Sequence, residues 1–397
     1  MRIAILTSGV LPVPAVQGGA VENLIDFCLD YNDKHRLHDI TVYSVSHPLI
    51  KNHPSLKSVV NHFYFIKTSG FFAAIKKRIY LRKHGGKEYY HYSVEYFLNQ
   101  ALKHINKMHY DAILVENRPG YVLKLQHKTI PIIIIHQEND YLNKSVPYYQ
   151  EIYDASHLII NTSEYITRQV KTINQSDIKC RTVLNGIDIQ HFFKSLPFPR
   201  EIVGLKKEDF VIVFSGRLTK DKGILELVRT MALLKNFVSI RLLIIGASAY
   251  GQDEQPTSFI KKLIYESEPI KDRIVFTGFI DYKEIPSYLK MADIAVVPSM
   301  WEEPFGLTVV EAMAAGLPLI TTRSGGIPEI CEGVSIILER NDIVKNMADA
   351  ILDLYEHKEK REQMAAAALK RSILFDKDTY AKNFFTAINS CVHKKSI

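Results

Sequence analysis

The chain alternates between short apolar runs and longer stretches in which apolar residues recur at helical spacing. Short apolar runs bounded by turn residues are typical of buried strands, whereas apolar residues at i, i+3, i+4 and i+7 are typical of amphipathic helices. Strands are predicted at residues 2–7, 40–44, 61–66, 112–115, 130–135, 157–160, 210–214, 241–245, 274–277, 293–298 and 317–321. Helices are predicted at about 20–30, 94–107, 163–172, 307–315, 344–357, 361–370 and 378–391, with another that ends near 234. This alternation predicts an α/β protein built from doubly wound, Rossmann-like sheets.

The length of the chain, 397 residues, suits two domains better than a single core. Between residues 191 and 208 the sequence becomes mixed and contains Pro197 and Pro199, which is typical of a linker. We therefore expect one domain over residues 1–195 and a second over residues 196–375.

Composition indicates an ordinary soluble α/β protein, with 47% hydrophobic and 23% charged residues. No apolar run approaches the roughly 20 residues that span a bilayer, and the first residues read as a strand rather than a signal peptide. The four cysteines show no metal-like pairing, which favours reduced thiols in a cytosolic protein. A net charge of +7 fits anionic substrates or an anionic membrane surface, and it does not by itself indicate nucleic acid.

The most informative stretch is 293–329, where a strand, a helix and a second strand follow closely and predict a parallel βαβ unit. Glu303 precedes the helix and Glu311 lies about one turn inside it. The backbone N–H groups of Phe305, Gly306 and Leu307 stand at the helix N-terminus, which attracts phosphate. A nucleotide sugar has hydroxyls on both sides of its phosphates and fits this pattern. On spacing alone, two solvated glutamates beside an ordinary turn fit equally well.

The string PSMWEEPFGLTVVEAMAAGLPLI followed by GGIPEI resembles the donor-site signature of the GT-B glycosyltransferases of family 4. A second element, G-R-x4-K-G, matches that family at Gly216, Arg217, Lys222 and Gly223. The resemblance implies a GT-B fold, with two Rossmann-like domains facing each other across a cleft. It also implies a helix over 376–393 that packs back on the first domain.

The resemblance assigns roles to the residues of the second domain. Arg217 and Lys222 would bind the donor diphosphate, Glu303 the sugar hydroxyls and Glu311 the ribose hydroxyls. The alternative for the two cations is that they are solvated near a helix start, where the macrodipole mildly disfavours them. The remaining donor contacts that the resemblance implies are Gly216, Gly246, Gly278, Phe279, Phe305, Gly306 and Leu307.

The first domain matches the family more sparsely. Gly18 and Gly19 would lie beside the donor diphosphate, although no G-x-G-x-x-G is present and a flexible connection is the alternative. The string LPVPAVQGGA also resembles the subgroup of spore coat protein SA and capsule transferases. His136 ends a central strand, where a lone histidine is more often structural, but the family places a histidine there that faces the donor sugar and the acceptor. Candidates for the acceptor side are Glu116, Asn117, Arg118 and Glu138.

Metal chemistry is not expected. The only D-x-D triplet is Asp376-Lys377-Asp378, where capping of the last helix is the better account. The sequence therefore predicts a retaining, metal-independent glycosyltransferase without a cofactor, which moves a sugar from a nucleoside diphosphate sugar to a glycan or lipid-linked acceptor in bacterial surface polysaccharide synthesis. The alternatives are a nucleotide-sugar epimerase of the same fold and a non-catalytic sugar-binding protein.

Residues 71–87 carry six basic residues and no acidic one, with Phe71, Ile75 and Ile79 at helix-face spacing. This pattern predicts either a solvated surface helix or a segment that binds anionic lipid at the inner face of a membrane. In the second case a lipid-linked acceptor would be delivered beside it.

Overall fold

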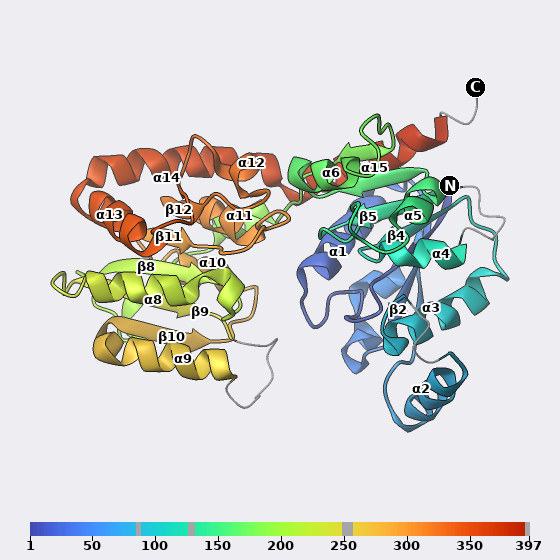
Figure 1. The fold of residues 1–397 in the computed structure, drawn as a ribbon, viewed down its shortest axis with the longest axis horizontal. Coiled ribbons are helices and arrows are strands. Elements are labelled where there is room, and N and C mark those ends of the chain that lie inside the picture. Colours follow the sequence, from blue (N-terminus) through green and yellow to red (C-terminus); the bar gives the residue numbers. More distant parts are fainter. Residues whose placement is uncertain (85–88, 126–131, 248–256, 394–397) are drawn as a thin grey trace. The chain divides into compact units, whose positions relative to one another are not determined.

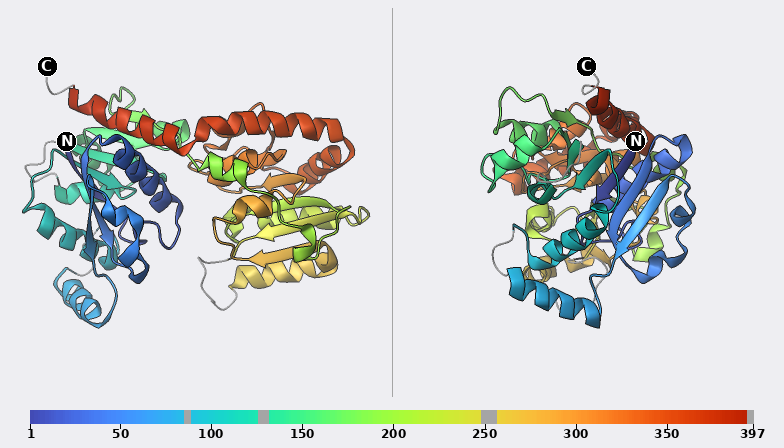
Figure 2. Two further views of the ribbon diagram at one scale, coloured as in Figure 1. Left: turned by 180° about the vertical axis from the view of Figure 1, so that it is seen from behind. Right: turned by 90° about the vertical axis from the view of Figure 1, so that its right-hand side faces the viewer.

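The structure is a computed structural model that describes residues 1–84, 89–125, 132–247 and 257–393. The chain divides into two compact units. Unit 1 contains Met1–Gly186 and Lys377–Ile397, and unit 2 contains Ile187–Asp376 (Figures 1 and 2).

Unit 1 is built on a seven-stranded parallel sheet with the strand order β3-β2-β1-β4-β5-β6-β7. Its strands are β1 (Arg2–Leu6), β2 (Asp39–Val45), β3 (Asn61–Ile66), β4 (Ala112–Glu116), β5 (Ile132–Gln137), β6 (Leu158–Asn161) and β7 (Cys180–Thr182). The predicted strand at 130–135 corresponds to β5, and its first two residues lie outside the described ranges. Because the order reverses between β1 and β4, the sheet has its switch point there, as the doubly wound prediction requires.

Helices cover both faces of this sheet. They are α1 (Ala20–His35), α2 (Phe71–His84), α3 (Tyr92–Ile105), α4 (Val122–Leu125), α5 (Tyr149–Ala155), α6 (Glu164–Lys171) and α15 (Lys377–His393). On one face, Leu24 of α1 and Phe384 of α15 pack against Ile3 and Ile5 of β1. On the other face the core includes Phe97 of α3. The last helix therefore supplies core side chains to the unit formed by the first residues of the chain.

Unit 2 contains a six-stranded parallel sheet with the order β10-β9-β8-β11-β12-β13. The strands are β8 (Phe210–Ser215), β9 (Ile240–Ile245), β10 (Ile274–Gly278), β11 (Ile294–Val297), β12 (Leu319–Thr322) and β13 (Ile336–Leu338). The helices are α7 (Ile189–Lys194), α8 (Ile224–Leu233), α9 (Ser258–Ser267), α10 (Ile285–Leu289), α11 (Leu307–Ala314), α12 (Ile327–Cys331), α13 (Ile343–Glu356) and α14 (Lys358–Ser372). This sheet reverses its order between β8 and β11, so its switch point lies there.

The segment that reads as a linker in the sequence is packed into unit 2. Helix α7 lies against α10 and α11. Arg200 donates to the Met291 carbonyl at 2.7 Å and to the Asp293 carboxylate at 2.9 Å. Unit 2 therefore begins at Ile187 rather than at the expected residue 196. The proline content suggested an extended connection, whereas the tertiary contacts fix the segment.

Candidate functional site

The candidate residues of unit 2 gather at the carboxyl ends of β8 and β11, which flank the switch point. Arg217 and Lys222 follow β8, and Glu303 follows β11. Ligands of open α/β sheets bind at this edge because the loops that leave neighbouring strands diverge there. The sequence order alone gave no reason for residues 217 and 303 to meet, and the parallel pairing of β8 with β11 brings their loops together.

Lys222 and Glu303 form a buried ion pair. The Lys222 ammonium donates to Glu303 Oε1 at 2.6 Å, and the Ser299 hydroxyl donates to the same oxygen at 2.7 Å. Neither bond uses Oε2, so the second carboxylate oxygen can accept hydrogen bonds from a ligand. The Lys222 ammonium also lies 5.2 Å from the ring centroid of Trp301, at a distance typical of a cation–π contact. Glu303 is thus held in a fixed orientation.

Arg217 differs from Lys222 in its exposure. Its side chain is exposed, and it makes no ion pair with any residue that the structure describes. A charged guanidinium in the same loop as Lys222 is therefore available to an anion. The two cations were predicted to share one ligand, and the structure places both in the loop after β8.

Two glycines bring the backbone of this site close together. Gly223 has a φ of +71°, and a Cβ there would lie 1.8 Å from the Pro298 carbonyl oxygen. Gly246 has a φ of +142°, and a Cβ would lie 1.9 Å from the Gly216 carbonyl oxygen. Side chains at either position would push apart the loops after β8, β9 and β11. Gly216 and Gly246 thus lie at adjacent loops, as expected for a shared donor site.

The loop after β11 is fixed by a hydroxyl network. Thr322 and Ser324 donate to the Ser299 carbonyl at 2.6 and 2.9 Å, and the Gly326 amide donates to the Glu303 carbonyl at 2.8 Å. The G-G-I-P-E segment after β12 therefore supports the loop that carries Glu303. Orientation by fixed backbone contacts is what a residue that binds sugar hydroxyls needs.

Helix α11 begins after Gly306, whose φ is +112°. The backbone N–H groups of its first turn lack intrahelical acceptors. They point toward the N-terminal end of the helix, where Leu307 begins it. Phe305 is buried and its ring centroid lies 6.0 Å from that of Phe375. This packing fixes the segment that leads into the helix, so the backbone of Phe305, Gly306 and Leu307 is held rigidly at the start of α11.

Glu311 is buried in the middle of α11. Burial raises the pKa of Glu311 to about 7, and a hydrogen bond from the Tyr282 hydroxyl opposes this rise. The Tyr282 ring packs on Phe192 of α7, with centroids 6.5 Å apart. Tyr282 and Ser299 are the contacts of the two glutamates that sequence reasoning missed, because a single tyrosine or serine in a loop gives no spacing signal.

The other positions of unit 2 lie near the end of β10. The Gly246 amide donates to the Gly278 carbonyl at 3.0 Å, and Gly278 has a φ of +74°. Phe279 is 55% exposed. An exposed aromatic ring next to two glycines can stack on a planar base.

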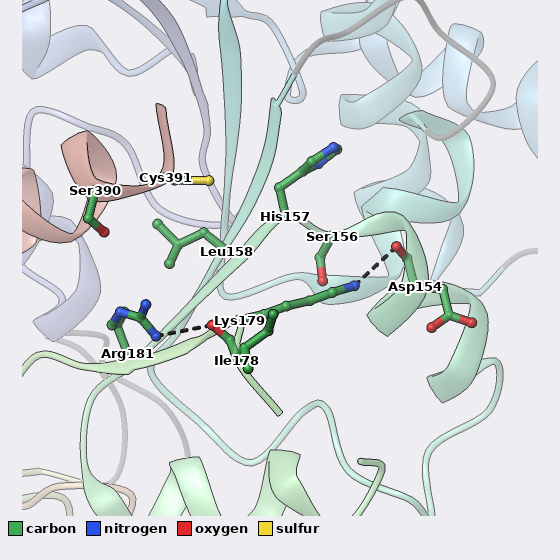
Figure 3. A pocket seen from close by; sticks show the side chains of 9 residues that line it. All are labelled: Asp154, Ser156, His157, Leu158, Ile178, Lys179, Arg181, Ser390 and Cys391. Carbon is green, nitrogen blue, oxygen red and sulfur yellow. Dashed lines mark hydrogen bonds between the residues drawn. The ribbon is translucent and has the colours of Figure 1, made fainter. Parts of the chain in front are cut away.

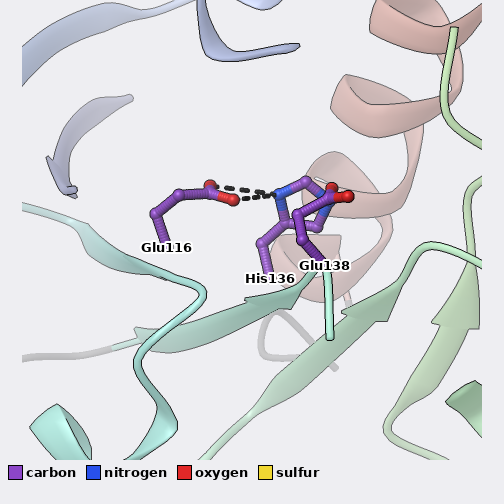
Figure 4. Close-up of side chains that lie close together, drawn as sticks. All are labelled: Glu116, His136 and Glu138. Carbon is purple, nitrogen blue, oxygen red and sulfur yellow. Dashed lines mark hydrogen bonds and ion pairs between the residues drawn. The ribbon is translucent and has the colours of Figure 1, made fainter. Parts of the chain in front are cut away.

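In unit 1, His136 lies between two carboxylates (Figure 4). Its Nδ1 is 2.9 Å from Glu116 Oε1 and its Nε2 is 3.1 Å from Glu138 Oε1, and all three side chains are buried. Burial lowers the pKa of His136, but the charge of Glu116 and the two carboxylate contacts outweigh it and raise the pKa to about 10. His136 is therefore an imidazolium clamped by two carboxylates. The Asn185 side-chain amide donates to Glu138 Oε2 at 2.5 Å, which holds this carboxylate in place.

Glu116, His136 and Glu138 also form the one group in the described part of the chain that could hold a metal ion. Their possible ligand atoms all lie within 4.8 Å of one another. However, the two ring nitrogens point in opposite directions, and each faces a different carboxylate. A histidine binds one ion through one nitrogen. A metal would therefore require the ring or one glutamate to turn away from its present partner.

The remaining unit 1 candidates lie in the loops after β1 and β4. Gly18 and Gly19 have φ values of +73° and +105°, and a Cβ on Gly19 would lie 2.2 Å from a carboxylate oxygen of Glu22. Asn117 has a φ of +52°, and its side-chain oxygen accepts from the Glu138 amide at 3.2 Å. The Arg118 guanidinium lies 5.3 Å from the Tyr90 ring centroid. Asn117 and Glu138 thus contact each other at neighbouring strand ends.

Comparisons with known proteins agree with this architecture. Residues 197–371 match the family described as glycosyl transferases group 1. Spore coat protein SA of Bacillus subtilis is 27% identical over 380 residues, covering 92% of this chain and 92% of that protein. A D-inositol 3-phosphate glycosyltransferase of Paenarthrobacter aurescens is 28% identical over 225 residues, covering 55% and 54%. The crystal structure of Anabaena HepE, solved with UDP and glucose, has a TM-score of 0.72 at 19% identity and covers 98% of this chain and 100% of its own.

Proposed function

We propose that this chain, which belongs to the glycosyl transferases group 1 family through residues 197–371, transfers a sugar from a nucleoside diphosphate sugar to a glycan or lipid-linked acceptor with retention of configuration. The observation that carries the proposal is the arrangement at the β8–β11 switch point. There Lys222 pairs with Glu303, which lies in the loop that leads into α11, and the exposed Arg217 lies in the same loop as Lys222.

The reaction breaks the bond between C1 of the donor sugar and the diphosphate oxygen, and it forms a bond from C1 to an acceptor hydroxyl oxygen. The hydroxyl proton leaves and the nucleoside diphosphate departs with the electron pair of the broken bond. Negative charge therefore grows on the leaving diphosphate. Preorganised cations that meet this charge stabilise the transition state more than the bound substrate.

Arg217, Lys222 and the amides at the start of α11 supply that charge in our proposal, without a metal ion. A charge-assisted hydrogen bond contributes about 1.5–3 kcal/mol, so two cations matter greatly. Glu303 Oε2 accepts from sugar hydroxyls while Oε1 stays bonded to Lys222 and Ser299. The binding of UDP and glucose by HepE, which has the same fold, supports a nucleotide sugar as donor.

A panel of UDP- and GDP-sugars incubated with the purified chain tests the proposal directly. Mass spectrometry should detect release of the nucleoside diphosphate from at least one donor, and release should persist in EDTA. If no donor is consumed, the transferase function fails. If EDTA abolishes consumption, the metal-free mechanism is wrong.

Donor affinity should depend on pH through Glu311. Only the ionised carboxylate accepts hydrogen bonds from both ribose hydroxyls, and the pKa of Glu311 lies at about 7. Between pH 6 and pH 8 the ionised fraction rises roughly tenfold, so affinity for a UDP-sugar should rise by about that factor. Calorimetric titration of a UDP-sugar measures it, because the diphosphate diester does not titrate in this range.

The matched variant is Glu311→Gln, which preserves shape and removes the titration. We expect weaker binding overall and a flat pH profile. A variant that keeps the wild-type pH dependence would show that another group causes it.

We further propose that helix α2 binds an anionic membrane surface, so that the enzyme works peripherally on the cytoplasmic side in surface polysaccharide synthesis. Phe71 and Ile79 are 75% and 60% exposed, and Ile75 shares their face of the helix. Its basic residues within the described range are Lys76, Lys77, Arg78, Arg82 and Lys83, and Lys87 of the predicted segment lies outside that range.

Apolar anchors and cations on one helix favour an anionic interface. No helix within the described residues combines the length and apolar character needed to cross a bilayer.

Liposome pelleting should therefore increase with the fraction of anionic lipid and decrease with salt. Each basic residue near such a surface contributes about 1 kcal/mol, so replacing Lys76, Lys77, Arg78, Arg82 and Lys83 with glutamine should abolish the binding. A control that replaces five exposed lysines of unit 2, Lys235, Lys345, Lys358, Lys360 and Lys370, should bind normally. Equal pelleting with neutral and anionic vesicles would contradict the proposal.

A further inference from the structure

Unit 1 has its own switch point, between β1 and β4, and one side chain there has no partner. The loop after β1 runs from Thr7 to Gly19, and the loop after β4 begins with Asn117 and Arg118. The Tyr121 hydroxyl donates to the Ser8 carbonyl at 3.2 Å, which ties the two loops together. These two loops lie at the edge of the sheet where open α/β units bind ligands. The hydrogen bond between them therefore fixes the structure of that edge.

Arg118 is only partly exposed, and its Nε is buried without a hydrogen-bond partner. Across the described part of the chain its guanidinium makes no hydrogen bond and no ion pair, and it lies 5.3 Å from the centroid of the Tyr90 ring. A guanidinium has five donors and is never deprotonated in a protein. A partly buried guanidinium without hydrogen bonds or an ion pair is unfavourable unless an anion binds to it.

The backbone that presents Arg118 is held rigidly. Asn117 before it is in the left-handed region, with a φ of +52°, and is fixed by its bond from the Glu138 amide. After it, the Gly120 amide donates to the Tyr90 hydroxyl at 3.0 Å. Such strain in a non-glycine residue persists where the surroundings impose it, and it clusters at binding sites.

Aromatic rings line the same corner. A Cβ on Gly120 would lie 2.4 Å from the Tyr89 ring, so this ring packs directly on the backbone beside Arg118. Tyr148, whose φ is +57°, is 59% exposed, and its ring centroid lies 6.3 Å from that of Tyr89. Partly exposed tyrosine rings offer an apolar face and a hydroxyl, which suits the alternating faces of a sugar ring.

The nearby Glu22 does not satisfy Arg118. Burial raises the pKa of Glu22 to about 7, and the charge of Arg118 counters only a small part of this rise. The two side chains do not form an ion pair, and Glu22 carries only part of its negative charge near neutral pH. An incoming anion therefore does not meet a fully charged carboxylate at this position.

We propose that Arg118 binds an anionic group of the acceptor, a phosphate or a carboxylate, while Tyr89 and Tyr148 contact the sugar that carries it. This inference rests on the proposed transferase function and narrows its acceptor to an acidic saccharide. Arg118 is a binding residue in this assignment, since the charge that assists the leaving diphosphate comes from unit 2.

A second arginine of unit 1 provides the matched control. Arg181 lines a pocket of about 290 Å³ formed near the starts of β6 and β7 and the end of α15, at the opposite edge of the sheet (Figure 3). Its guanidinium already donates to the Ile178 and Cys180 carbonyls, at 3.1 and 2.6 Å. Arg181→Gln therefore removes the same charge from the same unit without touching the corner at Arg118.

The experiment measures binding of three probes to the full chain by calorimetry: glucose 6-phosphate, glucuronic acid and glucose. At least one anionic probe should bind more tightly than glucose, and which one binds distinguishes phosphate from carboxylate. Arg118→Gln should weaken that binding roughly 10- to 100-fold, the loss expected for a charge-assisted hydrogen bond, and Arg118→Lys should restore part of it. Arg181→Gln should bind as the wild type does, and UDP affinity should not change in any variant.

Unchanged affinity in Arg118→Gln, glucose binding as tightly as both anionic probes, or no binding of either anionic probe would each overturn the inference. The failure of the proposed function is a separate result, because it appears as no consumption of any nucleotide sugar by the wild type. Retained UDP affinity in Arg118→Gln shows that unit 2 is intact, and an unchanged thermal unfolding curve shows that unit 1 is folded, so a loss of probe binding reports on this corner alone.

Discussion

Replacing Lys222 with alanine should lower the turnover number about 100- to 1000-fold in a protein that still folds, which is the loss typical of removing one preorganised donor from a developing oxyanion. Two effects add. The leaving diphosphate loses a cation, and Glu303, whose Oε1 accepts from Lys222 at 2.6 Å, loses the partner that orients it. Arg217→Ala should cost a similar factor through the first effect alone, because Arg217 makes no ion pair with a described residue.

Lys220→Ala is the matched control. Lys220 is an exposed lysine two residues earlier in the same turn, and it should tolerate the change. Steady-state release of the nucleoside diphosphate measures all three variants, and thermal unfolding checks that they fold. Full activity in the Arg217→Ala, Lys222→Ala double variant would refute the cationic mechanism. Glu303→Gln should reduce turnover and sugar selectivity more than it reduces affinity for the nucleoside diphosphate.

Replacing His136 with alanine should destabilise the protein by about 3–5 kcal/mol, because it leaves a buried charge pair without its cation. Glu116 and Glu138 would then face each other across the space of the lost ring, and both are buried. Urea unfolding monitored on the full chain measures the change in the free energy of unfolding. Glu116→Gln, Glu138→Gln and His136→Gln combined should recover most of the loss, since no uncompensated charge remains.

The same clamp predicts a pH dependence for the wild type. The pKa of His136 is raised from 6.5 to about 10 in the folded protein, so the folded state holds a proton that the unfolded chain releases. The stabilisation is therefore fully present below about pH 6.5 and is lost as the pH rises through about 10. His136→Gln should remove this contribution, and a His136→Gln variant with the wild-type alkaline profile would show that other groups cause it.

Much of the fold could be predicted from the sequence. Apolar runs located the strands of both sheets except the edge strands β7 and β13, and helical spacing located α3, α6, α11, α13, α14 and α15 to within a few residues. These features are local, because a buried strand or an amphipathic helix must show its periodicity wherever it packs. The GT-B fold was predicted correctly from two motifs, and the likeness to HepE confirms it. Both motifs lie within residues 197–371, which match the family described as glycosyl transferases group 1.

Short elements and the limits of the units were less visible. Strand β13 and helices α7, α10 and α12 have three to six residues, too few to show a period. The segment around Arg200 reads as a linker from its prolines, yet long-range bonds to Met291 and Asp293 fix it in unit 2. Sequence composition reports the local preference of a segment and cannot report its distant partners.

The sequence by itself determined which chemical groups this protein possesses: two cations after one strand, two carboxylates around a helix start, and a histidine at the end of another strand. Only the tertiary structure decided which of them meet. Pairing of β8 with β11 brings Lys222 to Glu303, and pairing of β4 with β5 clamps His136 between Glu116 and Glu138. The tertiary structure also leaves the Arg118 guanidinium without a hydrogen-bond or ion-pair partner among the described residues. The physical reason is that charge and motif are properties of single residues, whereas partnership in a parallel sheet depends on strand order, which joins positions 20 to 81 residues apart.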